Sequence, residues 1–128
     1  MEQITQMTLP GGGVEFFKDL KRKFFLARPH GVINPPMLAT DLKLARNFSK
    51  EIQGPWTYIT NTEHVRLVNP YNLRYLKEVK KIKHLKRIVI FAPGFFNRLL
   101  IRASGVLVQP DMIIKDKAEF EKFLDHVK

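Results

Sequence analysis

Hydrophobic and polar positions along the chain follow two spacings, one typical of helices and the other of strands. From Asn34 onward the apolar residues recur at positions that fall on one face of a helix. These residues are Leu38, Leu42, Ala45, Phe48 and Ile52. Asn34-Pro35-Pro36 is a capped helix entry and Gly54-Pro55 ends the pattern, so the sequence predicts a long amphipathic helix between them.

A short apolar strand, Trp56-Thr57-Tyr58-Ile59, follows that helix, and a polar turn leads from it to Val65-Arg66-Leu67-Val68. Asn69-Pro70 then predicts a second helix start, because Asn accepts a hydrogen bond from a free backbone N–H and Pro has no N–H to lose. In this helix Leu73, Leu76 and Val79 are expected to face inward while the lysines face solvent.

The second half of the chain continues the alternation of helices and strands. Arg87 to Ala92 contains a continuous apolar run from Ile88 onward and is bounded by Pro93-Gly94, which is typical of a strand that is central in a sheet or covered on both faces. A short helix with Phe95, Phe96, Leu99, Leu100 and Ile101 is expected next, then an edge strand at Met112-Ile113-Ile114. The last element is a helix whose apolar stripe is Phe120, Phe123, Leu124 and Val127.

The Phe95-Phe96 pair has two interpretations. We expect it to belong to the core at the start of a helix, with one ring exposed because adjacent helical positions cannot both point fully inward. The alternative is a partly exposed apolar lip, beside Arg98 and Arg102, that meets a partner or an anionic membrane surface.

The first part of the chain is harder to assign. Gly11-Gly12-Gly13 predicts a flexible turn and lacks the Lys-Ser/Thr of a phosphate-binding loop. Val14 to Ala27 is interpreted as a β-hairpin that turns near Lys18-Asp19, because its aromatic density suits a pleated surface; an amphipathic basic helix is the alternative. For residues 1–20 the sequence does not decide between a hairpin, a helix and a flexible arm.

The order of elements after Gly31 is helix, strand, helix, strand, helix, strand, helix, which requires parallel strands joined by right-handed crossovers. With the hairpin in front, the sequence predicts an α/β fold with a mixed sheet and about four helices packed on it. The 128 residues, 15.0 kDa in all, fit one domain spanning residues 1–128.

Composition excludes some classes of site. The chain has no cysteine, so it has neither a disulfide framework nor a thiolate metal site nor a cysteine nucleophile. Its start, Met1 to Gln6, lacks the features of a signal peptide, and no apolar run is long enough to cross a bilayer. We therefore expect a soluble, cytoplasmic protein, with peripheral attachment to a membrane as the alternative.

The charge balance is compatible with an anionic partner, although a solvated helix face is the preferred interpretation. Lys and Arg number 22 against 12 Asp and Glu, which gives a net charge of +10, and the excess is concentrated in Lys18 to Arg28 and in Arg74 to Arg87. This pattern suits a solvated helix face, or a binding surface for nucleic acid, an acidic protein or a membrane. The candidate anion-binding residues are Lys77, Lys80, Lys81, Arg98 and Arg102. Nucleic acid is the least favoured partner, because few aromatic residues are interleaved with the cations.

From Tyr58 to Leu76 the chain resembles the central strand, loop and helix of STAS domains, the anti-sigma factor antagonist family with its SpoIIAA-like relatives. The Gly31-Val32-Ile33 turn and the Ile88-Val89-Ile90 strand fit the same plan, so the resemblance covers roughly Lys23 to Val127. It implies a non-enzymatic module that recognises a partner at the start of the second helix.

The chain departs from the family at its regulatory loop. Phospho-regulated STAS domains carry Asp followed by two serines at this helix start, whereas the matching positions here are Asn69, Pro70 and Tyr71. The only serines in the chain are Ser49 and Ser104, so the phosphoserine switch is not expected.

We therefore expect a protein-interaction or regulatory module. A protein partner or a second copy of the chain is expected to bind at the helix from Asn69 to Lys81 and at the neighbouring segment from Ala92 to Arg102. The candidate partner-binding residues are Asn69, Tyr71, Asn72, Arg74, Lys77 and Phe95. Binding to an anionic surface through the lysine-rich residues 70–87 is one alternative, and a small apolar ligand held between Phe95 and the sheet is another.

Catalysis and cofactors are not expected. The four histidines are scattered without an i, i+4 pair, so no metal site is predicted. Glu63-His64 has no accompanying nucleophile or oxyanion hole, so it is interpreted as a polar turn rather than a general base.

Overall fold

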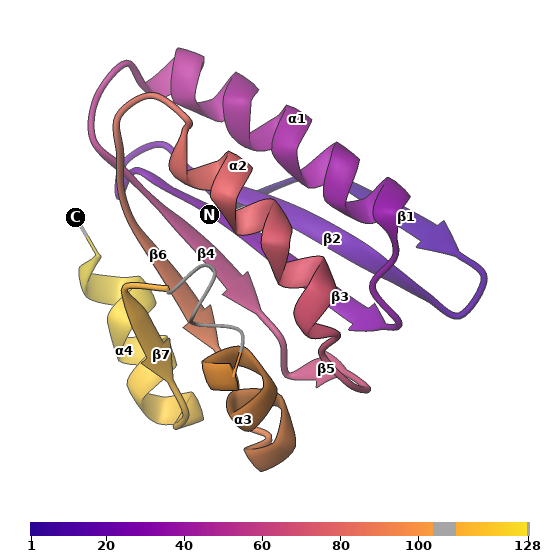
Figure 1. The fold of residues 1–128 in the computed structure, drawn as a ribbon. Coiled ribbons are helices and arrows are strands. Elements are labelled where there is room, and N and C mark those ends of the chain that lie inside the picture. The colour runs from indigo at the N-terminus through magenta and orange to yellow at the C-terminus, as the bar shows by residue number, and fades with distance from the viewer. Residues whose placement is uncertain (104–109, 128) are drawn as a thin grey trace.

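The computed structural model describes residues 1–103 and 110–127, with only the backbone at Pro70 and Tyr71. In this part of the chain a seven-stranded mixed sheet has the spatial order β1-β2-β3-β4-β6-β7, and the short β5 pairs with β3 (Figure 1). The strands are β1 Glu2–Leu9, β2 Gly12–Asp19, β3 Phe24–Gly31, β4 Trp56–Asn61, β5 His64–Val65, β6 Leu85–Phe91 and β7 Met112–Ile114.

Helices alternate with the strands after β3, as the sequence predicts. They are α1 Pro35–Ile52, the 3₁₀ helix η1 Pro70–Tyr75, α2 Leu76–Lys80, α3 Phe95–Ala103 and α4 Lys117–His126. β3, β4, β6 and β7 are parallel to one another, and β1, β2 and β3 are antiparallel neighbours. The predicted α/β fold, with a mixed sheet and a hairpin at its front, is confirmed.

The hairpin in the first part of the chain is confirmed, and the alternative of a basic helix is wrong. Val14 and Phe16 alternate inward on β2, and the Phe16 ring stacks on Phe25 of β3. The turn lies two residues later than predicted, because Asp19 still pairs with Phe24 and its carboxylate accepts a hydrogen bond from the backbone N–H of Arg22 at 2.8 Å. Residues 2–9, which the sequence left open, form a further strand on the outer side of β2.

The second helix differs from its prediction, although Leu73, Leu76 and Val79 are buried as expected. It begins as a 3₁₀ helix and becomes α-helical only at Leu76. In a 3₁₀ helix residues three apart share one face, and here Asn72 and Tyr75 both turn inward to hydrogen bonds with other elements. The structure also has a short strand that the sequence did not predict, β5, at His64–Val65.

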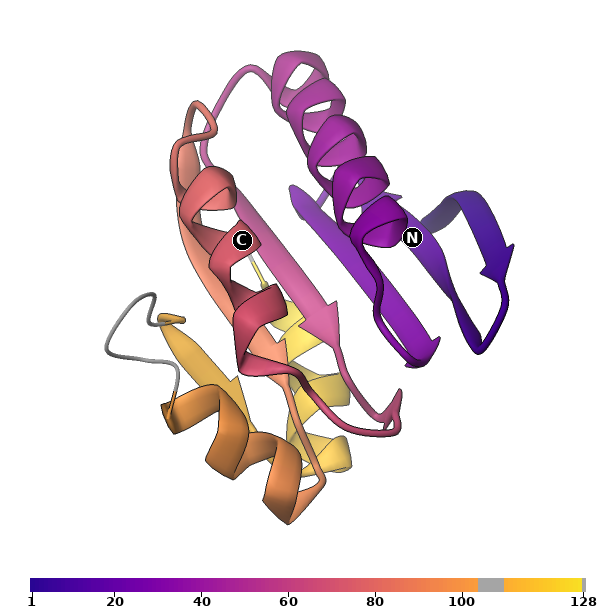
Figure 2. The same cartoon turned by 45° about the vertical axis from the view of Figure 1, so that its right-hand side comes forward.

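Apolar side chains fill both faces of the sheet. On one face α1, α2 and α3 cover a large cluster that includes Phe25, Phe48, Trp56 and Ile101. On the other, α4 covers a smaller cluster in which Phe91 stacks on Phe120 with ring centroids 4.3 Å apart. Figure 2 shows α1 and α2 together on one side of the strands and α4 behind them. The continuous apolar run of β6 is therefore explained by burial on both faces.

Candidate interaction site

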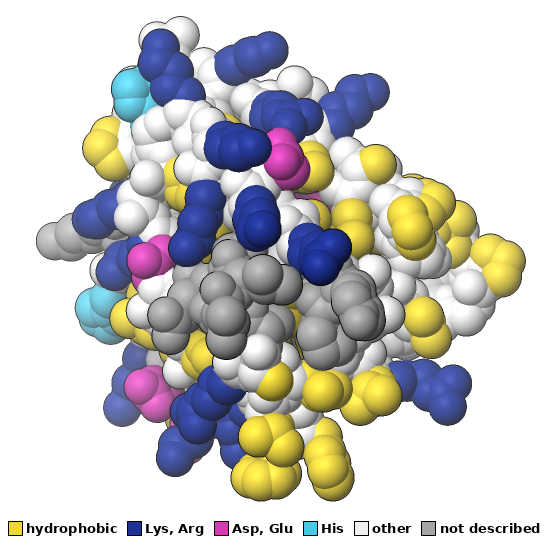
Figure 3. Space-filling model, in the orientation of Figure 1, with side chains coloured by type: hydrophobic (Ala, Val, Ile, Leu, Met, Phe, Trp, Pro, Cys, Tyr) yellow, Lys and Arg dark blue, Asp and Glu magenta, His cyan; other side chains and the backbone are white. Residues whose placement is uncertain are grey.

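The outward face of α3 is apolar. Phe95, Phe96 and Leu99 are 66%, 70% and 53% exposed, whereas Asn97 and Ile101 on the opposite face are buried. The two phenylalanine rings meet edge to face with centroids 5.8 Å apart. Large apolar side chains thus gather at one end of the molecule, over α3, as Figure 3 shows at its lower edge.

Asn97 sets the orientation of this helix. Its side-chain oxygen accepts a hydrogen bond from the backbone N–H of Val68 at 2.8 Å, and its side-chain nitrogen donates to the backbone carbonyl of Val65 at 3.2 Å. The N–H of Val68 lies in the segment that joins β5 to η1, and the carbonyl belongs to Val65, the last residue of β5. Because Asn97 and Ile101 lie one turn apart on the inner face, the side chains on the other side of α3 must point to solvent.

The expected core position of Phe95 and Phe96 is wrong, since both rings are exposed. The hydrogen bonds of Asn97 and the burial of Ile101 in the core set which face of α3 is buried. Phe95 therefore does not face the sheet. The small apolar ligand that was expected between Phe95 and the sheet has no site there.

Arg98 is tied to the protein itself. Its guanidinium donates hydrogen bonds to the backbone carbonyls of Ala92 and Pro93, at 3.1 and 2.6 Å. This half-buried side chain holds the loop that precedes α3. Arg102, in the last turn of the helix, is exposed. Of these two predicted anion-binding residues, Arg102 is thus the one that faces solvent beside the apolar face.

The part of the sequence that contains η1, α2, β6 and α3 is strongly basic. Between residues 64 and 110, Glu78 is the single acidic residue among ten Lys and Arg. Most of these cations are exposed; they are Arg66, Arg74, Lys77, Lys80, Lys81, Lys83, Lys86 and Arg102. Figure 3 shows Lys and Arg side chains spread over α1 and α2, above the apolar end.

Some of the sequence-predicted binding residues are exposed in the structure, and others form contacts within the protein. η1 packs beside α3, which brings the start of the second helix close to the helix of Phe95. Arg74 and Lys77 are exposed, whereas Asn72 is half-buried and donates a hydrogen bond from its side chain to the Ile33 carbonyl at 3.0 Å. Asn72 therefore has a structural role.

The remaining predicted positions lie at the two ends of the second helix. Asn69 is exposed at the start of η1, and the side chain of Tyr71 lies outside the described residues. Lys80 and Lys81 are exposed at the end of α2, in the direction of the turn into β6.

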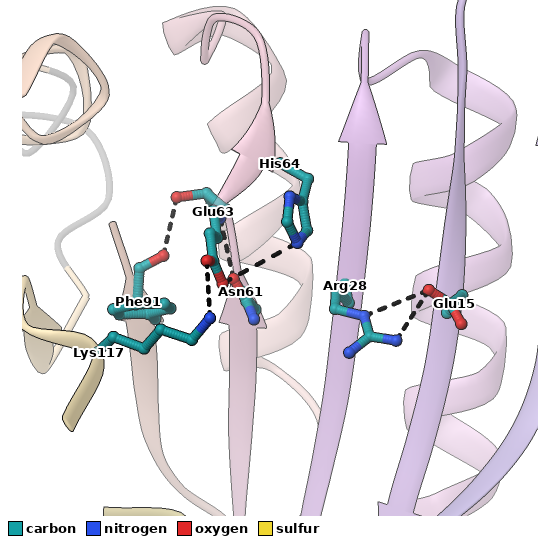
Figure 4. A network of polar contacts seen from close by, with 8 residues as sticks. Glu15, Arg28, Asn61, Glu63, His64, Phe91 and Lys117 are labelled. Atoms are coloured by element: carbon teal, nitrogen blue, oxygen red, sulfur yellow. Dashed lines mark hydrogen bonds and ion pairs between the residues drawn. The ribbon is translucent and has the colours of Figure 1, made fainter. Parts of the chain in front are cut away.

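The polar turn around Glu63 connects three elements (Figure 4). Its carboxylate lies 3.2 Å from the ammonium group of Lys117 on α4 and 4.0 Å from the ring of His64. The backbone N–H of Glu63 donates to the side chain of Asn61 at 2.9 Å, and the hydroxyl of Thr62 donates to the Phe91 carbonyl at 2.8 Å. These contacts tie the end of β4 to β6 and α4.

A buried carboxyl group that was not predicted from the sequence lies between α1 and the sheet. Asp41 of α1 is buried and accepts a hydrogen bond from the hydroxyl of Tyr58. The Tyr58 hydroxyl is also 2.8 Å from that of Tyr75, which in turn is 3.5 Å from the hydroxyl of Thr60. One acid, two phenols and one alcohol from three elements thus form a chain within an apolar layer.

Burial raises the pKa of Asp41 to about 7, and the hydrogen bond from Tyr58 opposes that rise. The pKa values of Tyr58 and Tyr75 are also raised, first by burial and then by the nearby carboxyl. The second oxygen of Asp41 has no hydrogen-bond partner among the described residues. Asp41, Thr60 and Tyr75 line an otherwise apolar cavity of about 20 Å³, large enough for about one water molecule.

One signal in the sequence marks this site. The inner stripe of α1 runs through Met37, Asp41, Ala45 and Phe48, while the predicted inward residues Leu38, Leu42 and Ile52 are only half-buried. An acid at the second position of this stripe, together with tyrosines at inward positions of β4 and η1, is the pattern that predicts a buried hydrogen-bonded carboxyl group.

A scan against models of known protein families finds no match, and a search of curated proteins finds no similar sequence. In residues 1–103 and 110–127, no three potential metal ligands of the His, Asp or Glu type come together. The same part of the chain contains no helix that is both long and apolar enough to cross a bilayer.

Proposed function

We propose that this chain is a non-catalytic protein-interaction module that binds its partner on the outward face of α3. The observation that carries the proposal is the exposure of Phe95, Phe96 and Leu99 on a helix whose inner face is held by side-chain hydrogen bonds. Clustered apolar side chains on the solvent-exposed surface of a protein are typical of a site that another molecule covers.

A second segment adds to this apolar surface. Leu67 is 62% exposed, and it precedes Val68 in the segment that Asn97 ties to α3. Aromatic side chains are frequent among the residues that contribute most to protein–protein binding. Because α3 and this segment are tied to each other, the surface is largely formed before binding, which lowers the entropic cost of association.

Charge indicates the kind of partner. Arg66, Arg74 and Arg102 are exposed on the segment before η1, on η1 and on α3, so positive charge lies beside the apolar face. An apolar patch with an acidic rim is therefore complementary to it. A second copy of the chain is a poorer partner, because each copy carries a net charge of +10 and the two copies repel.

The resemblance to STAS domains supports the same proposal. It implies partner recognition at the start of the second helix, and η1, the start of that helix, packs beside α3. Arg74 and Lys77 are exposed on this helix and extend the surface with further cations. Asn69, Pro70 and Tyr71 stand where the phospho-regulated members carry Asp and two serines, so the proposed recognition does not depend on phosphorylation of this loop.

Site-specific crosslinking tests the proposal. A photoreactive phenylalanine analogue is placed at position 96, and at position 121 on α4 as the control. We expect position 96 to capture one acidic protein that position 121 does not capture. Binding of that purified protein should weaken about 100-fold in the Phe95→Ser/Phe96→Ser variant, which removes two aromatic anchors. Equal affinity of the variant and the wild type would contradict the proposal.

Binding to an anionic surface is a second candidate, favoured by the exposed cations of α2 and of the turn that follows it. Vesicles that contain phosphatidylserine distinguish it from the first. The protein should then bind the vesicles with an affinity that falls steeply as salt rises. If Phe95→Ser/Phe96→Ser abolishes vesicle binding and no protein is captured at position 96, the α3 face is a lipid-binding site instead.

A further inference from the structure

An open cleft of about 640 Å³ lies at the end of the molecule opposite to α3. It is formed where the end of α1 meets the turn between α2 and β6, near the first residues of β4 and β6. α3 follows the last residue of β6, so the full length of the parallel strands separates the two sites (Figure 1). Binding sites for small molecules commonly have this volume.

The lining of the cleft is basic. Arg46 and Lys50 of α1 and Lys81, Lys83 and His84 of the turn line it, together with the side chain of Ser49. No acidic residue belongs to the lining. The cleft thus joins cations from two segments that are more than thirty residues apart in the chain.

Most of these cations have no acidic partner in the part of the chain that the structure describes. Lys81 forms a 3.3 Å ion pair with Glu78, between two exposed side chains. Arg46, Lys50 and Lys83 make no ion pair with any described residue. The partial negative charge at the end of α1 offsets part of the charge of Lys50. A net positive charge remains in the cleft, where it favours a bound anion.

Hydrogen bonds hold the turn that carries Lys83 against α1. The backbone carbonyl of Lys83 accepts from the hydroxyl of Ser49 at 2.6 Å and from the indole N–H of Trp56 at 3.0 Å. The backbone N–H of Trp56 donates to the His84 carbonyl at 3.2 Å, and the side chain of Ile82 is buried. The backbone that carries the cations is therefore in place before a ligand arrives.

The backbone at His84 is also unusual. Its φ angle is +66°, in the left-handed region that residues other than glycine rarely adopt. Such a conformation persists only where its surroundings determine it, and it occurs often at ligand sites. Here it lies directly after Lys83, at the point where the chain turns into β6.

We propose that this cleft binds a small soluble anion that carries two or more linked phosphate groups. Several cations on a fixed backbone match several adjacent negative charges, whereas a single carboxylate would leave most of the cations unused. Ser49 and Gln53 provide neutral polar groups at the same place, and Ile82 provides an apolar one. The proposal does not depend on the function of the α3 face.

Titration of the whole protein with inorganic tripolyphosphate at 0.15 M salt tests this proposal by calorimetry and amide NMR. We expect one tripolyphosphate to bind per chain, with shifts confined to the amides of residues 46–53 and 81–84. The Arg46→Gln/Lys83→Gln variant should weaken binding about tenfold or more, because it removes two charge-assisted contacts. Lys83→Arg keeps the charge and should keep the affinity.

The matched control is Lys115→Gln/Lys122→Gln, which lowers the net charge by the same amount at two exposed residues outside the cleft. We expect this control to bind within about twofold of the wild type, because screening weakens distant charges at this salt concentration. If the two double variants lose affinity equally, or if the shifts spread over the basic surface, the anion is attracted only by net charge and the proposed site is excluded. Absence of binding excludes it as well.

Discussion

The side chain of Asn97 accepts a hydrogen bond from the backbone N–H of Val68, and this contact ties α3 to the segment between β5 and η1. The same side chain donates to the Val65 carbonyl, so one amide group completes the hydrogen bonding of two backbone groups where the β-ladder ends. The exposure of Phe95 and Phe96 on the other side of α3 follows from this attachment.

Asn97→Ala should destabilise the fold by about 2 kcal/mol, because it leaves the N–H of Val68 and the carbonyl of Val65 without their partner. Urea unfolding measures the loss. Hydrogen exchange at the Val68 amide should become faster, since that amide loses its acceptor. Asn47→Ala is the control, on an exposed position of α1, and should leave both measurements nearly unchanged.

Removal of the exposed rings should leave stability almost unaltered. Phe95→Ser and Phe96→Ser should each change the free energy of unfolding by about 0.5 kcal/mol or less, because both side chains already face water. Phe91→Ala, at a buried ring stacked on Phe120, should cost about 3 kcal/mol or more. Thermal unfolding of the three variants checks this contrast. A large loss in either serine variant would mean that the outward face of α3 is packed in solution.

Asp41 should make stability depend on pH in an unusual direction. Its pKa is raised from 3.8 to about 7 on folding, so the folded state holds the proton more tightly than the unfolded state between these values. The contribution of Asp41 to the free energy of unfolding is therefore full below pH 3.8, declines as pH rises, and is lost above about 7. A pKa shift of this size corresponds to a total decline of roughly 4 kcal/mol in the free energy of unfolding.

The difference in stability between wild type and Asp41→Asn isolates this effect, because other titrating groups cancel. Asn retains an oxygen that can accept from Tyr58 but cannot titrate. In urea unfolding, we expect the free energy of unfolding of the variant, relative to that of the wild type, to rise by a few kcal/mol between pH 5 and pH 8. A difference that does not vary with pH would show that Asp41 keeps an ordinary pKa in the folded protein.

Gly31→Ala should be strongly destabilising. The φ angle of Gly31 is +71°, and a Cβ atom at this position would lie 2.3 Å from the backbone oxygen of Gly11. We expect a loss of about 2 kcal/mol or more, since neither the strain nor the overlap is relieved without moving the β1–β2 turn. Gly54→Ala is the control: its nearest contact to a Cβ would be 4.0 Å away, and its stability should stay close to that of the wild type.

Local patterns in the sequence were sufficient for the order of elements. The cap at Asn34, the apolar runs of β4 and β6 and the breaks at Gly54-Pro55 and Pro93-Gly94 act within a few residues, so they can be read without knowledge of the fold. The alternation that they describe requires parallel strands with crossovers, and the structure has them. Residues 2–9 escaped prediction because β1 is an edge strand whose side chains are mostly exposed.

The sites depended on contacts between distant segments. Asp41 and Tyr58 are on neighbouring elements of the core, yet no local rule pairs an acid of one with a phenol of the other. Asn97 binds the backbone of Val68, 29 residues earlier, and Ile101 enters the core, so the Phe95-Phe96 pair on the other side of α3 faces solvent. Arg46 and Lys83 became neighbours only when α1 and the α2–β6 turn packed together. The sequence by itself determined which segments are helices and strands, because their short-range hydrogen bonding and apolar spacing are local. The tertiary structure alone decided which polar and charged groups meet, because those meetings are set by packing across the sheet.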